Sequence, residues 1–408
     1  MRVLMVSWEF PPHIIGGLGR HVMYLAPALA RLGIEVHVLT PQRRGGAAHE
    51  VTPEGVHIHR VAPPNVADDD LVAFTHQMNA VLEVAAHTLQ HTLGPFDLIH
   101  AHDWQVADVG VMLKHAWQIP LIATIHATER GRGQGYIWTR QSEQINHIEW
   151  QLTFEAWRVI VCSHFMADQM LQSFHTPSDK IDVIPNGVTI QPSPFASAAE
   201  RDAFRHQFVE DGDPLVFNVG RVVFEKGVHM LLEAWPAVLA QQPGARLVIA
   251  GKGAQLDRLK ARAWELGIAD QVHFTGYISD EELERLYHVA DVAVFPSLYE
   301  PFGIVALEAM AAHCPVIVTQ TGGLMEVVQM HRTGLTVPPN NPEALTWAIL
   351  HTTQHPDWTA ARVEDAFAEA RDTFSWQRVA SETAEVYQRT YAAWQHDDWG
   401  KVPALAFS

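Results

Sequence analysis

Short apolar runs rich in β-branched residues alternate with longer amphipathic stretches along the first part of the chain. Such runs predict buried parallel strands, and the amphipathic stretches between them predict helices. In the first half, strands are expected at 3–7, 35–39, 57–61, 98–101, 121–125, 159–162 and 181–184. Helices are expected at 18–32, 70–93, 141–156 and 164–174. This succession of strand and helix predicts an α/β domain with a parallel sheet.

The alternation stops near residue 187 and starts again at residue 215. The segment that follows the stop is rich in Pro, Ser and Ala, which is typical of a domain connection. Further strands are expected at 215–220, 246–250, 272–274, 292–295, 316–319 and 335–337. We therefore expect a first domain over 1–190, a linker over 191–214, a second domain over 215–375 and a C-terminal segment over 376–408. The pattern of that last segment predicts a helix over 376–394, which we expect to cross back to the first domain.

The predicted fold class is therefore α/β, with two Rossmann-like domains that face each other across a cleft. In open parallel sheets, ligands bind beyond the carboxyl ends of the strands, in the loops that follow them. Candidate binding residues are accordingly expected in those loops.

The length of 408 residues suits two or three domains, each with its own core. Integral membrane association is not expected, because no apolar run approaches the length of about 20 residues that a membrane helix needs. The strand-like run 2–6 follows Met1 directly, which argues against a signal peptide. Cys162 and Cys314 each lie in an apolar run, and we expect both to be buried thiols in a reducing cytoplasm.

The formal net charge of −18 argues against a nucleic-acid partner, since phosphate backbones are bound by basic surfaces. The 25 histidines are scattered along the sequence, without a His-Glu-x-x-His or Cys/His pattern. A metal site is therefore not expected, and neither is a cofactor. The expected partners are small molecules, and the oligomeric state is left open.

The first strand leads into a loop that contains Gly16 and Gly17 just before a predicted helix. Glycines at a helix start let a ligand approach the backbone and expose free amides at the positive end of the helix dipole. Such a loop suits a diphosphate, although it also suits a tight turn. Its spacing matches neither the dinucleotide fingerprint Gly-x-Gly-x-x-Gly nor a P-loop.

The second domain opens with a comparable loop, which carries Arg221 and Lys226 between a strand and a helix. Two cations on one loop can neutralise the charge that develops on a leaving diphosphate. The alternative is a pair of solvated loop charges. In an acidic chain that also has a glycine-rich loop, the functional interpretation is favoured.

The most specific string is Ser-Leu-Tyr-Glu-Pro-Phe-Gly-Ile-Val-Ala-Leu-Glu-Ala-Met over 297–310. It follows a predicted strand, so Glu300 is expected on a loop and Gly303 at the start of a helix whose free amides face a ligand. Glu308 is expected further along that helix, within reach of ribose hydroxyls. Each acid taken separately is also compatible with a helix-end charge.

These motifs together resemble those of the retaining family-4 glycosyltransferases, in which two glutamates, here Glu300 and Glu308, are separated by seven residues. The resemblance covers nearly the whole chain and implies the GT-B architecture. It further implies a nucleotide sugar held mainly by the second domain and an acceptor held mainly by the first. The donor-site positions that it implies are Gly16, Gly17, Arg221, Lys226, Tyr277, Glu300, Phe302, Gly303, Ile304 and Glu308.

The resemblance also assigns a role to several of these positions. Glu300 would hold hydroxyls of the donor sugar, and Glu308 would hold the ribose. Arg221 and Lys226 would neutralise the diphosphate, whose oxygens would accept from the amides at 303–304. His126, which follows the strand at 121–125, matches the active-site histidine of the family. The catalytic set is therefore His126, Glu300, Arg221 and Lys226.

The acceptor side is expected at two loops of the first domain. The segment 97–104, which holds His102 and Asp103, resembles the glycogen- and starch-synthase branch, although both residues also suit a helix cap. The arginine cluster formed by Arg20, Arg130 and Arg132 is expected to hold an acceptor phosphate.

No Asp-x-Asp motif follows a strand to hold a divalent ion, so the expected mechanism needs no metal. The resemblance implies attack on the same face as the leaving group, with retention of configuration and with the departing phosphate as the base. The predicted reaction moves glucose from UDP-glucose, or from ADP-glucose, to fructose 6-phosphate, as in sucrose-phosphate synthases. The alternatives are an α-glucan synthase, a nucleotide-sugar 2-epimerase and a non-catalytic nucleotide-binding module.

Overall fold

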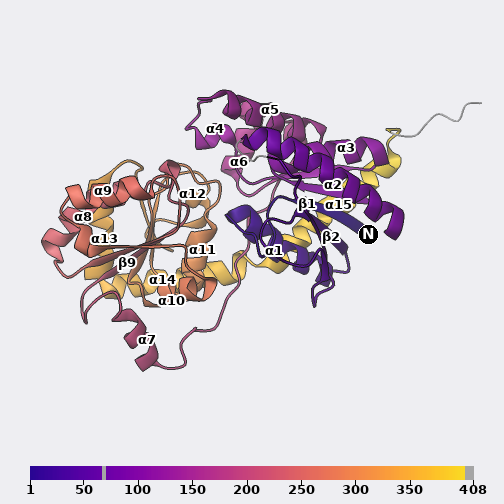
Figure 1. The fold of residues 1–408 in the computed structure, drawn as a ribbon. Helices are drawn as coiled ribbons and strands as arrows, with labels where there is room; N and C mark the ends of the chain where they lie inside the picture. Colours follow the sequence, from indigo (N-terminus) through magenta and orange to yellow (C-terminus); the bar gives the residue numbers. More distant parts are fainter. Residues whose placement is uncertain (67–69, 400–408) are drawn as a thin grey trace, which may run out of the picture. The chain divides into compact units, whose positions relative to one another are not determined.

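The computed structural model describes residues 1–66 and 70–399, which form two compact units (Figure 1). The first unit comprises Met1–Pro185 together with the chain from Trp376 onward, and the second comprises Asn186–Ser375. Within the described ranges, no helix has both the length and the apolar character needed to cross a membrane. Cys162 and Cys314 are buried thiols, as the sequence predicts.

The described part of the first unit forms an eight-stranded sheet in the order β3-β4-β2-β1-β5-β6-β7-β8. Its strands are β1 (Arg2–Ser7), β2 (Glu35–Pro41), β3 (His49–Val51), β4 (His57–Val61), β5 (Leu98–His102), β6 (Leu121–Ile125), β7 (Arg158–Val161) and β8 (Ile181–Val183). All neighbouring strands of this sheet pair in parallel except β3, which pairs antiparallel with β4. The sequence predicted every parallel strand but missed β3, a three-residue edge strand without a buried face.

Helices cover this sheet and carry several of the predicted site residues. They are α1 (Gly17–Arg31), α2 (Leu71–Leu93), α3 (Ala107–Trp117), α4 (Glu129–Arg132), α5 (Arg140–Glu155), α6 (His164–Phe174) and α15 (Trp376–His396). Side-chain caps begin several of them; the Asp70 carboxylate, for example, accepts from the amides of Val72 and Ala73 at the start of α2. Helix α15 packs against α1, and its Tyr387 is fully buried in the same core as Met5 of β1.

The second unit is built around a six-stranded parallel sheet in the order β11-β10-β9-β12-β13-β14, within the residues described. Its strands are β9 (Leu215–Val219), β10 (Arg246–Ala250), β11 (Val272–Gly276), β12 (Val292–Phe295), β13 (Val316–Thr319) and β14 (Leu335–Val337). Its helices are α7 (Ala198–Arg205), α8 (Val228–Gln241), α9 (Leu256–Glu265), α10 (Asp280–Val289), α11 (Ile304–Ala311), α12 (Leu324–Val327), α13 (Pro342–Gln354) and α14 (Pro356–Thr373). The prediction of two parallel-sheet α/β domains is confirmed.

The segment expected to be a linker, 191–214, differs from that expectation. It contains α7, which Ser197 caps by accepting from the amide of Glu200. Arg205 at the end of α7 donates to the carbonyl of Val289 and pairs with Asp291 at 2.8 Å. The segment therefore packs as part of the second unit. The prediction differed because the Ser- and Ala-rich composition concealed a capped helix.

Candidate active site

In the second unit, the predicted donor residues Lys226 and Glu300 form an ion pair. The Lys226 Nζ lies 2.6 Å from the Glu300 Oε2, which also accepts a hydrogen bond from the Ser297 hydroxyl at 3.2 Å. The Glu300 side chain is only 10% exposed, whereas that of Lys226 is 22% exposed. The pair places a cation and a carboxylate side by side in one half-buried position.

Two loops are locked together around this ion pair. The amides of Leu298 and Tyr299 both donate to the carbonyl of Glu225, which joins the loop after β9 to the loop after β12. Gly227 has φ +66° and lies so close that a Cβ there would be 1.9 Å from the carbonyl oxygen of Pro296. Any side chain at this position would separate the loops, so the glycine is required for Lys226 to reach Glu300.

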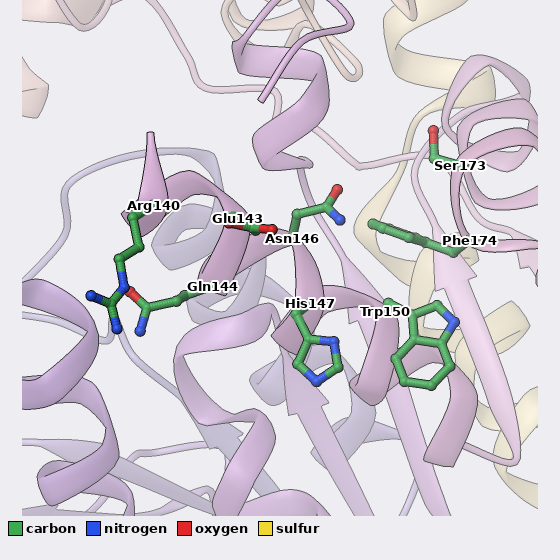
Figure 2. A pocket seen from close by; sticks show the side chains of 8 residues that line it. All are labelled: Arg140, Glu143, Gln144, Asn146, His147, Trp150, Ser173 and Phe174. Carbon is green, nitrogen blue, oxygen red and sulfur yellow. The ribbon is translucent and has the colours of Figure 1, made fainter. Parts of the chain in front are cut away.

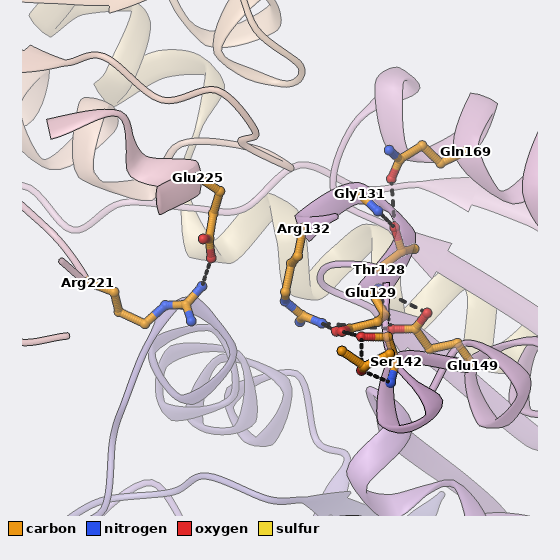
Figure 3. Close-up of polar contacts among 10 residues, drawn as sticks. Thr128, Glu129, Gly131, Arg132, Ser142, Glu149, Gln169, Arg221 and Glu225 are labelled. Atoms are coloured by element: carbon orange, nitrogen blue, oxygen red, sulfur yellow. Dashed lines mark hydrogen bonds and ion pairs between the residues drawn. The ribbon is translucent and has the colours of Figure 1, made fainter. Parts of the chain in front are cut away.

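Arg221, the second predicted diphosphate ligand, is more exposed than Lys226. Its Nη2 lies 3.3 Å from the Oε1 of Glu225 (Figure 3), and its side chain is 43% exposed. An exposed pair of this kind contributes little to stability. The guanidinium is therefore held loosely enough to exchange its partner for an anionic ligand.

Helix α11 carries the rest of the predicted donor motif. Gly303 precedes it with φ +110°, a conformation that favours glycine, and Ile304 is its first residue. Glu308 accepts a hydrogen bond of 3.3 Å from the hydroxyl of Tyr287. Phe302 is buried and packs edge-on against Phe374, so its ring serves packing within this unit.

Tyr277, the loosest of the donor predictions, follows β11 directly. Its side chain is 70% exposed. The structure thus keeps it on the surface, where a planar base is able to stack on the ring.

In the first unit, the carboxylate of Glu9 already binds the backbone amides of the glycine loop. One carboxylate oxygen of Glu9 accepts from the amides of Ile15 and Gly16, at 2.8 and 3.0 Å. Gly19 makes this possible, because a Cβ there would be 2.8 Å from the same Glu9 oxygen. Gly16 and Gly17 stay predicted donor positions, although the Gly16 amide is engaged by Glu9 in this structure.

A buried carboxyl group positions the predicted catalytic histidine of the first unit. The backbone amide of His126 donates to the Asp103 Oδ1 at 2.6 Å. Asp103 has φ +63° and is only 4% exposed, and its burial raises the pKa of the carboxyl to about 7. Asp103 therefore acts as a hydrogen-bond partner of the loop backbone rather than as the helix cap that the sequence also allowed, because its side chain makes no capping hydrogen bond.

Glu149 on α5 is a second buried carboxyl group, and the sequence analysis did not identify it. Its oxygens accept from the amide of Glu129 at 2.9 and 3.1 Å (Figure 3), and the residue is 1% exposed. Burial raises the pKa of Glu149 to about 8, against the opposing charge of Arg132. An acidic residue within the apolar face of a predicted helix was the available signal.

Three of the scattered histidines come together in the first unit. The Nδ1 of His102 lies 3.1 Å from the Nε2 of His126, and ring nitrogens of His21, His102 and His126 all lie within 4.8 Å of one another. Burial lowers the pKa of His102 and His126 well below the usual value, so both rings are neutral. No sequence pattern marked this cluster, because the three residues belong to elements far apart in the sequence.

A fourth histidine supports this group from behind. The ring nitrogens of His100 lie 2.7 Å from the hydroxyl of Tyr387 and 2.7 Å from that of Thr124. Its ring is 4.1 Å from the ring of His102, and burial lowers its pKa to about 3. Burial thus keeps the rings of His100, His102 and His126 uncharged.

The predicted arginine cluster is only partly available to an acceptor. Arg132 lies 3.4 Å from the Glu129 carboxylate and 3.9 Å from that of Glu149 (Figure 3), so internal acids surround its charge. Arg130 donates to the carbonyl of Gly135, and its buried Nε has no hydrogen-bond partner among the described residues. Arg20 lies on α1.

Two open hollows lie along α5. The first has a volume of about 510 Å³ and is lined by polar and aromatic side chains (Figure 2), among them His147 and Trp150. The second measures about 480 Å³ and includes Arg130 and Trp138. Arg130, one of the predicted site residues, therefore borders the second hollow.

Comparisons with known proteins agree with this arrangement. The family model described as Glycosyl transferases group 1 matches residues 200–365, and the model described as Glycosyltransferase Family 4 matches residues 15–191. The chain is 38% identical over 401 residues to a glycogen synthase of Mycobacterium tuberculosis, covering 95% of this chain and 94% of that protein. It is 36% identical over 397 residues to an uncharacterized glycosyltransferase of Methanocaldococcus jannaschii, covering 95% and 98%.

A likeness to a solved structure supports the fold assignment. Sucrose-phosphate synthase from Thermosynechococcus elongatus matches with a TM-score of 0.81 and 26% identity, covering 96% of this chain and 99% of that one. The predicted GT-B class is thereby confirmed. The chain belongs to the family-4 glycosyltransferases and is a hexosyltransferase.

Proposed function

We propose that this enzyme transfers a glucosyl group from a nucleotide sugar to a hydroxyl group of an α-glucan, with retention of configuration and without a metal. The observation that carries the proposal is the Lys226–Glu300 pair at 2.6 Å, within a donor motif shared with a protein family of known chemistry. UDP-glucose is the expected donor, and ADP-glucose is the alternative.

In the proposed reaction, the bond between the anomeric carbon and the diphosphate oxygen breaks, and the acceptor hydroxyl forms the new bond on the same face. The acceptor proton goes to the departing phosphate oxygen. Lys226 and Arg221 stabilise the negative charge on the leaving diphosphate, which removes the need for a divalent ion. Glu300 accepts hydrogen bonds from donor-sugar hydroxyls, and Glu308 from the ribose.

The glucan is favoured as the acceptor because Arg132 is not free to bind a phosphate. Its guanidinium lies against the carboxyl groups of Glu129 and Glu149, and a ligand would have to displace these contacts. The neutral rings of His102 and His126 suit an uncharged hydroxyl better than an anion. The 38% identity to a protein named as a glycogen synthase supports the same acceptor.

A sugar phosphate such as fructose 6-phosphate is the second candidate acceptor. Arg130 favours it, because the buried Nε of this residue has no hydrogen-bond partner among the residues described and the side chain borders a hollow. The likeness to a sucrose-phosphate synthase points the same way.

A screen with product identification tests the proposal. The full chain is incubated with UDP-glucose or ADP-glucose, each with a malto-oligosaccharide or with fructose 6-phosphate, in the presence of EDTA. We expect an elongated oligosaccharide with an α linkage by NMR, unaffected by EDTA. Loss of turnover in EDTA that magnesium restores would show that the metal-free mechanism is wrong.

The same screen separates the other classes of protein. An epimerised nucleotide sugar in the absence of acceptor would indicate a 2-epimerase. Nucleotide binding without product from any acceptor would indicate a non-catalytic module. Exclusive transfer to fructose 6-phosphate would replace the glucan by the second candidate.

A further inference from the structure

Three imidazole rings from three separate elements meet in the first unit. His21 lies on α1, His102 ends β5 and His126 follows β6. Their ring centroids are 4.7, 5.4 and 5.5 Å apart. We propose that His21, His102 and His126 form a binding site for Zn²⁺, and that the bound ion blocks sugar transfer.

The spacing of the rings fits one tetrahedral ion. Nitrogens bonded to Zn²⁺ at about 2.0–2.1 Å lie about 3.3 Å from each other in tetrahedral geometry. The His102 Nδ1 and the His126 Nε2 are 3.1 Å apart, and the ligand nitrogens of all three residues lie within 4.8 Å of one another. One pair already has nearly the tetrahedral spacing, and the third nitrogen has to move closer for all three to reach one ion.

The donor atoms select the class of metal. All three ligands are imidazoles, which suit zinc and its neighbours, whereas Mg²⁺ and Ca²⁺ prefer oxygen ligands. The neutral imidazole is the form that binds metal.

The site is also rigid on one side and accessible on the other. His102 is fully buried, and its ring lies against His100, which hydrogen bonds to Tyr387 and Thr124 hold in place. The buried Nε2 of His102 has no hydrogen-bond partner in the described part of the chain. His126 is a partly exposed residue, which gives an ion a route to the cluster.

The inhibitory part of the inference rests on the proposed function. His126 is the residue expected beside the reacting sugar, so an ion bound to its ring would compete with the acceptor. Transfer itself needs no metal in the proposed mechanism. The enzyme should therefore work in EDTA and lose activity when zinc is added.

Direct metal binding tests the site without any assay of activity. The full chain, free of tags and stripped with EDTA, is dialysed and titrated with Zn²⁺ against a chromophoric chelator. We expect one tightly bound ion per chain. His21→Gln and His126→Gln should each weaken binding by about tenfold or more, while His91→Gln on the exposed face of α2 should bind like the wild type.

Co²⁺ provides a second readout that needs no variant. The wild type loaded with Co²⁺ should show the visible absorption bands of tetrahedral coordination. Separately, thermal melting should show that His21→Gln and His126→Gln are folded. Binding by His21→Gln and His126→Gln that equals binding by the wild type would overturn the site. So would the absence of a tightly bound ion in the wild type.

The transfer assay then separates this inference from the proposed function. Zn²⁺ should raise the apparent KM for the acceptor, and EDTA should reverse the effect. Failure to bind zinc while transfer proceeds would reject the metal site and leave the proposed function intact. Zinc bound at the cluster without any effect on transfer would reject the inhibition and the placement of His126 beside the acceptor.

Discussion

The predicted site residues of the two units differ in charge and in exposure to solvent. In the second unit, the predicted donor residues carry full charges on partly exposed loops, as in the pairs Lys226–Glu300 and Arg221–Glu225. In the first unit, the groups around His126 are buried and largely uncharged. Charged side chains suit a diphosphate whose charge grows as the sugar departs, whereas neutral side chains suit a hydroxyl that must be positioned.

The two units also differ in what holds the reactive groups in place. Around Glu300, backbone hydrogen bonds and close glycine contacts join adjacent loops, for example from Gly323 to the carbonyl of Glu300 at 2.9 Å. Around His126, the buried carboxyl groups of Asp103 and Glu149 accept from backbone amides of a single segment. A substitution in the second unit should therefore affect the stabilisation of charge on the diphosphate. A substitution in the first unit should affect the position of the loop that carries His126.

The largest expected effect is that of Lys226→Ala on turnover. Loss of one preorganised charge stabiliser lowers kcat by about 10²- to 10³-fold, and it leaves Glu300 without its cation. Steady-state kinetics with saturating donor measure the change. Lys260→Ala, on the exposed face of α9 in the same unit, is the control and should keep wild-type kcat. Equal kinetics for both variants would remove Lys226 from the catalytic set.

Glu308→Ala should weaken nucleotide binding by roughly 10- to 150-fold, since a hydrogen bond to a charged group contributes about 1.5–3 kcal/mol. Isothermal titration with UDP or ADP measures the affinity. Glu364→Ala, at an exposed position of α14, is the matched control and should bind like the wild type. Wild-type affinity in Glu308→Ala would contradict the ribose assignment.

The donor motif was predictable because it is local in the sequence. Glu300, Gly303 and Glu308 lie within nine consecutive residues, so one strand–loop–helix unit places all of them. Lys226 was identified separately, as a cation on the loop that opens the second domain, and the structure brings it to Glu300 through the close approach of Gly227 to the next loop. The parallel strands of both sheets were predictable for a similar reason, since each is a short local run rich in apolar residues, whereas the edge strand β3 was missed.

The histidine cluster and the backbone partner of Glu149 were not predictable, because these contacts arise from tertiary structure. His21 and His102 are 81 positions apart, and no periodicity in the sequence connects α1 with the end of β5. Glu149 stands out as an acid on the apolar face of its helix, but the sequence does not show that this face meets the amide of Glu129. A sequence pattern assigns a residue to a helix face but does not show which backbone group that face meets.

Glu149→Ala should destabilise the enzyme by about 1–3 kcal/mol, because the buried amide of Glu129 loses its acceptor. The same change should lower kcat, since the segment after β6 also carries His126. Chemical denaturation and kinetics measure the two effects. Glu149→Gln retains a carbonyl oxygen, so it should lie close to the wild type at pH 7, and Glu385→Gln on α15 should be neutral. A fully active Glu149→Ala variant would contradict the positioning role.

The raised pKa of Glu149 predicts a pH-dependent difference between the wild type and Glu149→Gln. The usual pKa of a glutamate is 4.5, and that of Glu149 in the folded state is about 8. Between these two pH values, the folded state binds a proton that the unfolded state has lost. Wild-type stability should therefore decrease across this range as pH rises, whereas the Gln variant lacks this contribution. Melting temperatures of the pair should agree near pH 5 and diverge by pH 9 in favour of Glu149→Gln. Parallel curves would indicate that the carboxyl is ionised in the fold.

The smallest expected effect is that of Arg130→Ala on transfer to a malto-oligosaccharide. With an uncharged acceptor, the arginine has no anion to bind, and its hydrogen bond to the Gly135 carbonyl is a modest contact. The change in acceptor kcat/KM should stay within about threefold, which corresponds to the roughly 0.5 kcal/mol typical of surface substitutions. With fructose 6-phosphate as acceptor, the same variant gives the decisive contrast, because a lost charged hydrogen bond to phosphate would lower kcat/KM by about tenfold or more. A large loss confined to the sugar phosphate, together with efficient transfer to it by the wild type, would show that the first unit does bind an anion. Arg130 would then contradict the comparison made above, because the first unit would also use a charged side chain to bind its substrate.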